Sequence, residues 1–246
     1  MLIIFVKQMN GFMNIKIERS INLKRKIVLA FLLVIFLLSG NSWGSPLAVG
    51  DIITFAPGIG TTNGGPFKTY KDGNYLFDTF CLERNEYMYY SGAAQFKIYG
   101  IDSYANAGGS GGQTEPGKDY LSKEAKWLYY NFTMGTLGAK VNGFSYNTDG
   151  ANALQYAIWS LEGEGYGGNY LSNAAALAIS AKDTAGIDSI MALNIAWDTN
   201  SLGYIVGTKA QSMIYNANPV PEPASMMLFG TGCVVFGGYL RRKLKK

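Results

Sequence analysis

Apolar positions in the middle of the chain follow two periods, one typical of strands and one typical of helices. Short runs rich in β-branched and aromatic residues predict strands. Apolar residues spaced three and four positions apart predict helices, as at positions 121, 125, 128 and 129. The strands are expected over residues 49–55, 75–82, 96–101, 191–197 and 203–207, and the helices over 121–130, 150–161 and 173–181.

Glycine-rich segments separate several of these elements. Residues 58–65 and 107–117 are expected to be loops, because glycine is the main residue that interrupts regular structure. Asp149 is positioned to cap the helix that follows it. The order of elements predicts an α+β fold in a single ectodomain, with strands arranged as a sandwich or barrel and a helical subdomain inserted between them.

The N-terminal segment has the pattern of a secretion signal. Three cations at 24–26 precede an apolar run at 27–38, and the small residues Ser42 and Gly44 follow it. The apolar run is shorter than the roughly 20 residues that span a bilayer as a helix. We therefore predict a signal peptide with an upstream extension over residues 1–44, which signal peptidase cleaves between Gly44 and Ser45.

The C-terminal segment, residues 220–246, has three consecutive parts. Pro221, Glu222 and Pro223 are followed by an uncharged apolar stretch at 224–240 and then by six residues of which five are basic. The stretch is long enough for a short transmembrane helix, and the basic end marks its cytoplasmic side. This segment resembles the PEP-CTERM sorting signal of Gram-negative bacteria. The resemblance implies processing by an exosortase and a location at the cell envelope, outer surface or exopolysaccharide matrix.

The charge of the chain depends on these two ends. The whole chain has a formal net charge of +4, but residues 45–219 hold nine Lys and one Arg against nine Asp and six Glu, so 10 − 15 gives −5. A nucleic-acid partner is excluded because phosphate binding requires a basic face. The chain has no histidine, which excludes serine and cysteine triads with a histidine base and imidazole zinc sites. We expect a binding protein without metal or cofactor, and not an enzyme.

Two cysteines are present, and Cys233 lies in the apolar tail, so Cys81 is the single thiol of the ectodomain. The sequence around it, Phe80-Cys81-Leu82-Glu83, and the helical sequence Leu154-Gln155-Tyr156-Ala157-Ile158-Trp159 together resemble the thioester domains of Gram-positive surface adhesins. The resemblance implies an internal thioester between Cys81 and Gln155. Phe80, Tyr156 and Trp159 are then expected to shield that bond until an amine or hydroxyl ligand attacks it.

Other interpretations of the same residues remain open at this point. Cys81 has the character of a buried apolar filler, and Gln155 that of a residue at the edge of an apolar helix face whose amide bonds to the backbone. The protein would then be a structural component of the exopolysaccharide matrix without a thioester. A sugar hydrolase would need paired carboxylates, for which the candidates are Asp78, Glu83, Glu162 and Glu164, but we interpret these acids as solvated surface residues.

Overall fold

The structure is a computed structural model that describes residues 47–62, 65–86, 88, 94–106, 115–198 and 205–218. The strands are β1 (Ile52–Thr62), β2 (Gly65–Lys71), β3 (Asn74–Thr79), β4 (Phe96–Asp102), β5 (Tyr104–Asn106), β6 (Lys118–Tyr120), β7 (Ile190–Trp197) and β8 (Met213–Asn216). The helices are α2 (Lys123–Thr133), α3 (Leu137–Lys140), α4 (Thr148–Leu161) and α5 (Tyr170–Ser180), with a 3-10 turn η1 (Ile187–Ser189). The predicted order, with helices inserted between two groups of strands, is confirmed.

Six strands form one antiparallel sheet in the order β3-β2-β1-β4-β7-β8. The two outer strands of this order meet through the residues that follow β3. On either side of Cys81, the Phe80 carbonyl accepts from Ile214 N–H, and Leu82 N–H donates to the Ser212 carbonyl, each over 3.0 Å. The sheet therefore curls into a nearly closed barrel, which leaves few free backbone groups at its edges.

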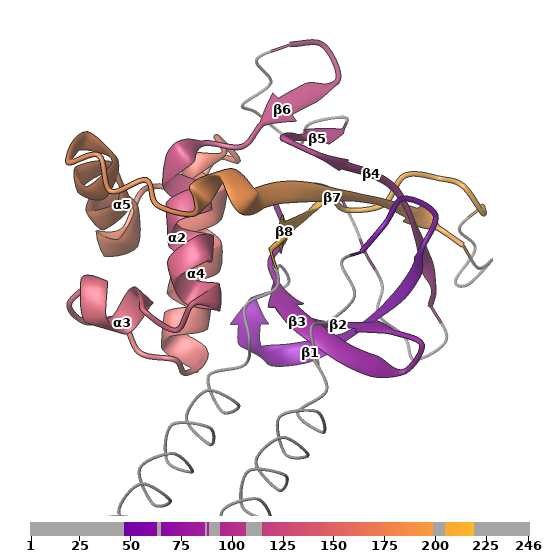
Figure 1. The fold of residues 1–246 in the computed structure, drawn as a ribbon, viewed down its shortest axis with the longest axis horizontal. Helices are drawn as coiled ribbons and strands as arrows, with labels where there is room; N and C mark the ends of the chain where they lie inside the picture. The colour runs from indigo at the N-terminus through magenta and orange to yellow at the C-terminus, as the bar shows by residue number, and fades with distance from the viewer. Residues whose placement is uncertain are drawn as a thin grey trace, which may run out of the picture. The chain divides into compact units, whose positions relative to one another are not determined.

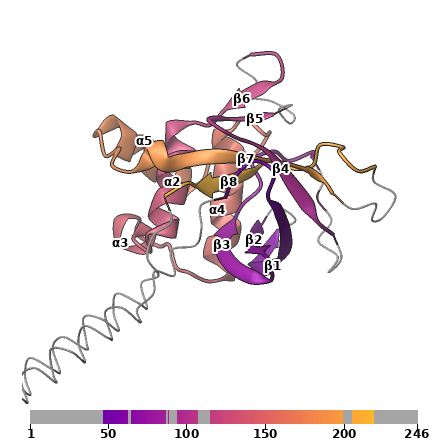
Figure 2. The same cartoon turned by 45° about the vertical axis from the view of Figure 1, so that its right-hand side comes forward.

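Helices α2, α4 and α5 pack against one another beside the barrel, as Figures 1 and 2 show. Helix α4 lies against β1 and β2, and α2 contacts β7 and β8. All three predicted helices are present in the structure. The helical layer thus covers the part of the barrel where its outer strands join.

The predicted cap of α4 is wrong. Asn147, not Asp149, caps the helix, because its side chain accepts a hydrogen bond of 2.9 Å from Gly150 N–H. The helix begins at Thr148, so Asp149 already lies within the first turn. A carboxylate there still stabilises the helix through the dipole.

Two predicted segments differ from the structure. β1 continues through residues 58–62, which the glycine content predicted to be a loop. A Cβ on Gly58 or Gly60 would collide with the backbone of the facing strand β2, so these glycines allow close strand packing. The described part of the strand predicted over 203–207 includes a turn, in which Gly207 has φ +85°.

Two apolar cores lie on opposite sides of the segment that follows β3. Phe80 and Leu82 belong to the core shared with the helices, whereas Cys81 belongs to the core inside the barrel with Phe96 and Trp197. This alternation is what extended backbone produces, because successive side chains point to opposite faces. The segment therefore separates the helical core from the barrel core.

None of the helices among the described residues is long and apolar enough to cross a bilayer. The predicted signal peptide at 1–44, its cleavage site at Gly44 and Ser45, and the predicted span at 224–240 lie outside the described residues. The Pro-Glu-Pro motif at 221–223 also lies outside them.

Replacing Phe80 by Ala is expected to lower the free energy of unfolding by about 3–5 kcal/mol, because it leaves a cavity between helices and barrel. Phe80 is fully buried, and its ring centroid lies 5.2 Å from that of Phe132 and 6.3 Å from that of Tyr129. Urea unfolding followed by circular dichroism measures the change. Leu177→Ala is the control, since this side chain is 73% exposed and its loss should change stability by less than about 0.5 kcal/mol.

Candidate functional site

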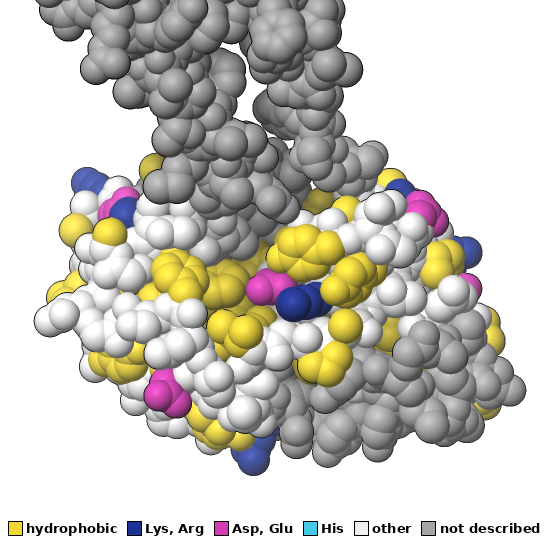
Figure 3. Space-filling view, turned by 90° about the horizontal axis from the view of Figure 1, so that it is seen from below, with side chains coloured by type: hydrophobic (Ala, Val, Ile, Leu, Met, Phe, Trp, Pro, Cys, Tyr) yellow, Lys and Arg dark blue, Asp and Glu magenta, His cyan; other side chains and the backbone are white. Residues whose placement is uncertain are grey.

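The exposed apolar side chains come from many elements. On the face shown in Figure 3, apolar side chains lie in several separate patches, with acidic and basic side chains among those near the centre. The large exposed apolar residues are Val49, Ile59, Tyr75, Tyr120, Tyr146, Tyr156, Tyr170, Leu177, Ile205 and Val206. Since these residues are dispersed over strands, helices and loops, the described surface does not single out one binding face, and the buried polar residues are more informative.

Cys81 and Gln155, the two residues predicted to be partners, lie in direct contact. The Gln155 side chain accepts a hydrogen bond of 3.1 Å from Cys81 N–H through Oε1. It donates one of 2.9 Å from Nε2 to the Cys81 carbonyl. Gln155 is fully buried and Cys81 is 3% exposed. The structure therefore brings a thiol-bearing residue and a carboxamide together across 74 residues of sequence.

The local backbone explains why a glutamine is needed at this position. Phe80 and Leu82 direct backbone groups toward β8, so in extended backbone the N–H and C=O of Cys81 face the opposite way. The pairing of β2 with β3 ends at Phe67 and Thr79, two residues before Cys81. A carboxamide carries an acceptor oxygen and donor N–H groups in one plane. Gln155 therefore supplies both the acceptor for the Cys81 N–H and the donor for the Cys81 carbonyl.

The thiol of Cys81 faces the barrel core. Its Sγ lies 4.0 Å from Sδ of Met213, which is also fully buried. Burial raises the pKa of the Cys81 thiol well above its ordinary value, and the carboxyl groups of Glu83 and Glu86 raise it further. The thiol is therefore protonated at neutral pH and unreactive toward reagents in solution.

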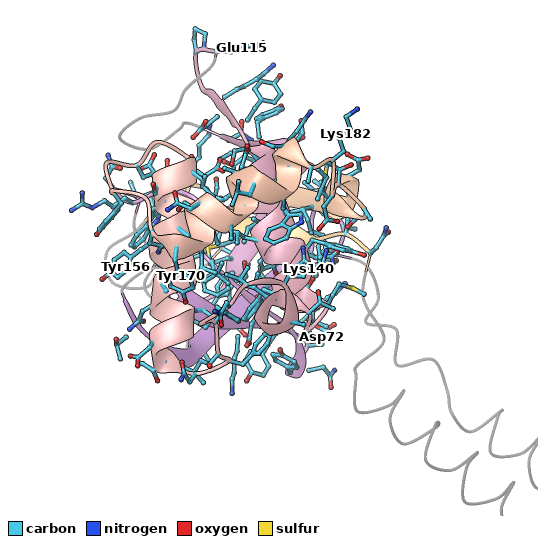
Figure 4. The ribbon with its side chains drawn as sticks, turned by 90° about the vertical axis from the view of Figure 1, so that its left-hand side faces the viewer. Asp72, Glu115, Lys140, Tyr156, Tyr170 and Lys182 are labelled. Carbon is cyan, nitrogen blue, oxygen red and sulfur yellow. The ribbon has the colours of Figure 1, made fainter. Side chains whose placement is uncertain are left out.

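The three aromatic residues predicted to shield the site lie in different surroundings. Phe80 is buried in the helical core, and Trp159 is 5% exposed in the barrel core that contains Cys81. Tyr156 is 38% exposed and lies on the helical side seen in Figure 4. Its ring packs 6.2 Å from that of Trp159 and 5.1 Å from that of Tyr166. Tyr156 thus covers Trp159 from outside, because its neighbour Gln155 occupies the inward direction.

Sequence reasoning missed Tyr166 as a member of this aromatic group. Its ring stacks on Trp159 with a centroid distance of 5.2 Å and an interplanar angle of 13°. The Arg84 guanidinium lies 4.6 Å from the centroid of the same ring. Such cation contacts with aromatic faces stabilise surface segments by about 0.5–1 kcal/mol. Tyr166 therefore joins the segment after Cys81 to the end of α4, a contact that only tertiary structure reveals.

A second glutamine holds the same segment from the other side. Gln211, which is 3% exposed, donates a hydrogen bond from Nε2 to the Glu83 carbonyl. Beside it, Ser212 Oγ donates to Asn194 Oδ1 over 2.8 Å. The stretch from Cys81 to Glu83 is thus fixed by buried amide groups from both α4 and the approach to β8. This arrangement makes the backbone around the thiol rigid.

The interpretation of the acids as solvated surface residues is wrong for three of the four. Glu83 and Glu164 are fully buried and Glu162 is 5% exposed, while Asp78 is partly buried. Glu164 Oε2 accepts from Arg84 N–H over 2.9 Å, and Glu162 Oε1 accepts from Ser122 Oγ over 2.6 Å. The Glu162 and Glu164 carboxyl groups thus accept hydrogen bonds from helix-end and backbone donors inside the fold, which the acidic composition did not reveal.

Burial and mutual repulsion raise the pKa values of this group of acids. The pKa of Glu83 rises to about 10, first through burial and then through the neighbouring carboxyl groups of Glu86, Glu164 and Asp119. Burial raises the pKa of Glu162 to about 7 and that of Asp119 to about 6. Among the described residues, no three or more Cys, Asp or Glu side chains are arranged to hold a metal ion.

Removing the Gln155 carboxamide is expected to destabilise the fold even without any covalent bond. In a Cys81→Ala background, Gln155→Ala should lower the free energy of unfolding by roughly 2–4 kcal/mol, because the buried N–H and C=O of residue 81 lose their partners. Guanidinium titration of the single and double variants measures the difference. A loss below about 1 kcal/mol would contradict a structural role for the two hydrogen bonds.

The buried acids make stability depend on pH. A carboxyl group whose pKa is raised in the folded state binds its proton more tightly there than in the unfolded state. Its contribution to the free energy of unfolding is therefore complete below the pKa of the unfolded state, and it is lost as the pH rises through the pKa of the folded state. For Asp119 and Glu162 this window runs from about 4 to 7. We expect these two groups to lower the free energy of unfolding by roughly 4 kcal/mol between pH 5 and pH 8. Glu83, whose pKa is raised to about 10, adds to the fall over the same range.

Denaturant titrations at several pH values measure this slope. Glu162→Gln should make the slope shallower, because the amide is neutral at every pH and still accepts a hydrogen bond from Ser122. Glu115→Gln is the matched control, since Glu115 lies in an exposed ion pair with Lys118. A wild-type protein that is more stable at pH 8 than at pH 5 would contradict the assignment.

Comparison with known proteins bears on the C-terminal end. Residues 219–243 match the family model of the PEP-CTERM protein-sorting motif. No curated protein and no solved structure matches the chain. The likeness of the ectodomain to thioester domains therefore stays a prediction. The motif indicates export with membrane or surface association, and it implies an exosortase as the processing partner. The chain thus carries a PEP-CTERM sorting motif, which indicates an exported protein processed by an exosortase.

Proposed function

We propose that this exported protein is a binding protein of the cell envelope or matrix, in which Cys81 and Gln155 form an internal thioester that captures a ligand covalently. The observation that supports the proposal is the pair of hydrogen bonds, 3.1 and 2.9 Å, between the Gln155 carboxamide and the backbone of Cys81. They hold the carboxamide beside the one residue of the ectodomain that carries a thiol.

Thioester formation needs only groups that this chain supplies. Cys81 Sγ attacks the side-chain carbonyl carbon of Gln155, the bond from that carbon to Nε2 breaks, and the nitrogen leaves as ammonia with the thiol proton. Cys81 N–H donates to Oε1, so it is placed to stabilise the negative charge that develops there. Holding two reacting groups in place supplies about 7–11 kcal/mol of the barrier, which suits a pair fixed inside a core.

The same site would react once with a ligand. A primary amine, such as a lysine side chain, attacks the thioester carbonyl, forms an amide with residue 155 and releases Cys81 as a thiol. A sugar hydroxyl would form an ester in the corresponding step. Exclusion of water from the buried bond prevents hydrolysis beforehand. Capture is a single event without turnover, so we propose binding and adhesion as the role, and not catalysis.

A second candidate function rests on the same hydrogen bonds. The Gln155 carboxamide is satisfied by the Cys81 backbone, which is what a purely structural glutamine requires. The protein would then serve as a structural component of the exopolysaccharide matrix without a thioester. A matrix-sugar hydrolase is the weaker alternative, because Glu83 and Glu164 are fully buried and out of reach of a polymer.

Intact mass of the purified, non-reduced protein separates the two candidates. A thioester makes the protein lighter by one ammonia than its sequence requires, and methylamine then adds one methylamine to that species. Cys81→Ala should remove both changes while keeping the backbone hydrogen bonds. A wild-type mass that equals the sequence mass, together with full alkylation of Cys81 after unfolding, would exclude the thioester and leave the structural candidate.

A further inference from the structure

The Gln155 carboxamide is covered by the β1–β2 hairpin. Gln155 is fully buried, so a ligand reaches its carbonyl only if a neighbouring segment moves. Gly65, the first residue of β2, lies so close that a Cβ there would be 3.3 Å from Gln155 Oε1 and 3.2 Å from Phe80 Cα. The hairpin backbone itself therefore lies against the predicted reactive carbonyl, with no side chain between them.

Two further glycines bring the other strand of the hairpin onto the same place. A Cβ on Gly58 would collide with the carbonyl of Pro66, and one on Gly60 would collide with that of Gly65. β1 consequently packs directly over the Gly65–Pro66 backbone, which packs over Gln155. We call these five residues, Gly58, Gly60, Thr61, Gly65 and Pro66, the hairpin end.

The hairpin end is fastened to helix α4 by a pair of hydrogen bonds. Thr61 N–H donates to Asn152 Oδ1 over 2.8 Å, and Asn152 Nδ2 donates to Thr61 Oγ1 over 2.7 Å. Asn152 precedes Gln155 by three residues, so both lie on neighbouring positions of one helix surface. These two hydrogen bonds are exposed to solvent, whereas the Gln155 carboxamide under the hairpin end is buried.

The sheet holds the hairpin end less firmly than the rest of the hairpin. β1 pairs with β4 at Ile52 and Ile53, at the opposite end of the strand. The register of β2 against β3 ends at Phe67, before Pro66. The hairpin end thus extends beyond the pairing of β1 and β2 with their outer neighbours, so it can separate from α4 without opening the barrel.

We propose that the hairpin end controls access to the Gln155 carbonyl and that the Thr61–Asn152 pair determines how readily it opens. The inference rests on the proposed thioester and adds how access to it is regulated and which primary amines react fastest. When the hairpin end opens, the Gln155 carbonyl is bounded by the Gly65 backbone on one side and the Phe80–Cys81 backbone on the other, so we expect the opening to be narrow. An unbranched primary amine, such as a lysine side chain or a polyamine, fits such a slot better than a branched amine.

The test compares variants of the purified exported protein. Asn152→Ala removes both hydrogen bonds at a partly exposed position and should raise the rate of methylamine incorporation about fivefold to tenfold. Asn152→Asp keeps the acceptor for Thr61 N–H and should give an intermediate rate. Asn173→Ala, at an exposed Asn of α5, is the matched control and should leave the rate unchanged. Isopropylamine should react much more slowly than methylamine with the wild type, and the difference should shrink in Asn152→Ala.

Hydrogen–deuterium exchange at Cys81 N–H provides a readout that does not depend on the thioester. Exchange should be faster in Asn152→Ala than in the wild type or the control variant, because opening of the hairpin end exposes that amide. Unchanged exchange would overturn the proposal. Faster exchange with an unchanged methylamine rate would also overturn it, because ligands would then enter by another route. If the wild type shows no loss of ammonia, the proposed thioester fails, and iodoacetamide labelling of Cys81 replaces methylamine as the second measurement.

Discussion

The carboxamide of Gln155 bonded to the backbone of Cys81 is the interaction on which this part of the fold depends. The segment after β3 bonds to β8 on one side, which nearly closes the barrel, and it would otherwise have unsatisfied peptide groups on the other side. A buried backbone group without a partner costs about 1–3 kcal/mol. Helix α4 removes that cost with a single side chain. This one contact therefore fixes together the position of the helical layer, the closure of the barrel and the position of the thiol.

The surroundings of Cys81 combine rigidity with low reactivity. Gln155 and Gln211 hold the backbone on both sides of the thiol, and the Glu83 carboxyl group lies near those of Glu86, Glu164 and Asp119. The carboxyl groups of Glu83 and Glu86 raise the pKa of the Cys81 thiol further than burial alone. An exported ectodomain with one thiol benefits from such surroundings, because a protonated buried thiol resists oxidation. The same surroundings would slow hydrolysis of a thioester.

The two ends of the chain differ from the ectodomain in charge. The predicted signal peptide and the sorting segment hold basic residues that make the whole chain cationic, although residues 45–219 are acidic. The sorting motif at 219–243 places the acidic domain outside the cytoplasm. There, covalent capture of an amine would resist the dilution that releases reversible ligands. Under the proposed mechanism, the glycine-rich hairpin over Gln155 would determine which amines reach the thioester.

The sequence by itself determined the features that depend on local periodicity and on contiguous motifs. Helices α2, α4 and α5 follow from apolar spacing, and the sorting motif follows from the order of its three parts. The Cys81–Gln155 pair followed from a family resemblance in two short motifs. Only tertiary structure decided that Glu83 and Glu164 are buried, that Gly58 and Gly60 belong to a strand, and that Tyr156 lies outside while Gln155 points inward. These features depend on which segments pack together across long stretches of sequence, and neither residue type nor periodicity specifies that packing.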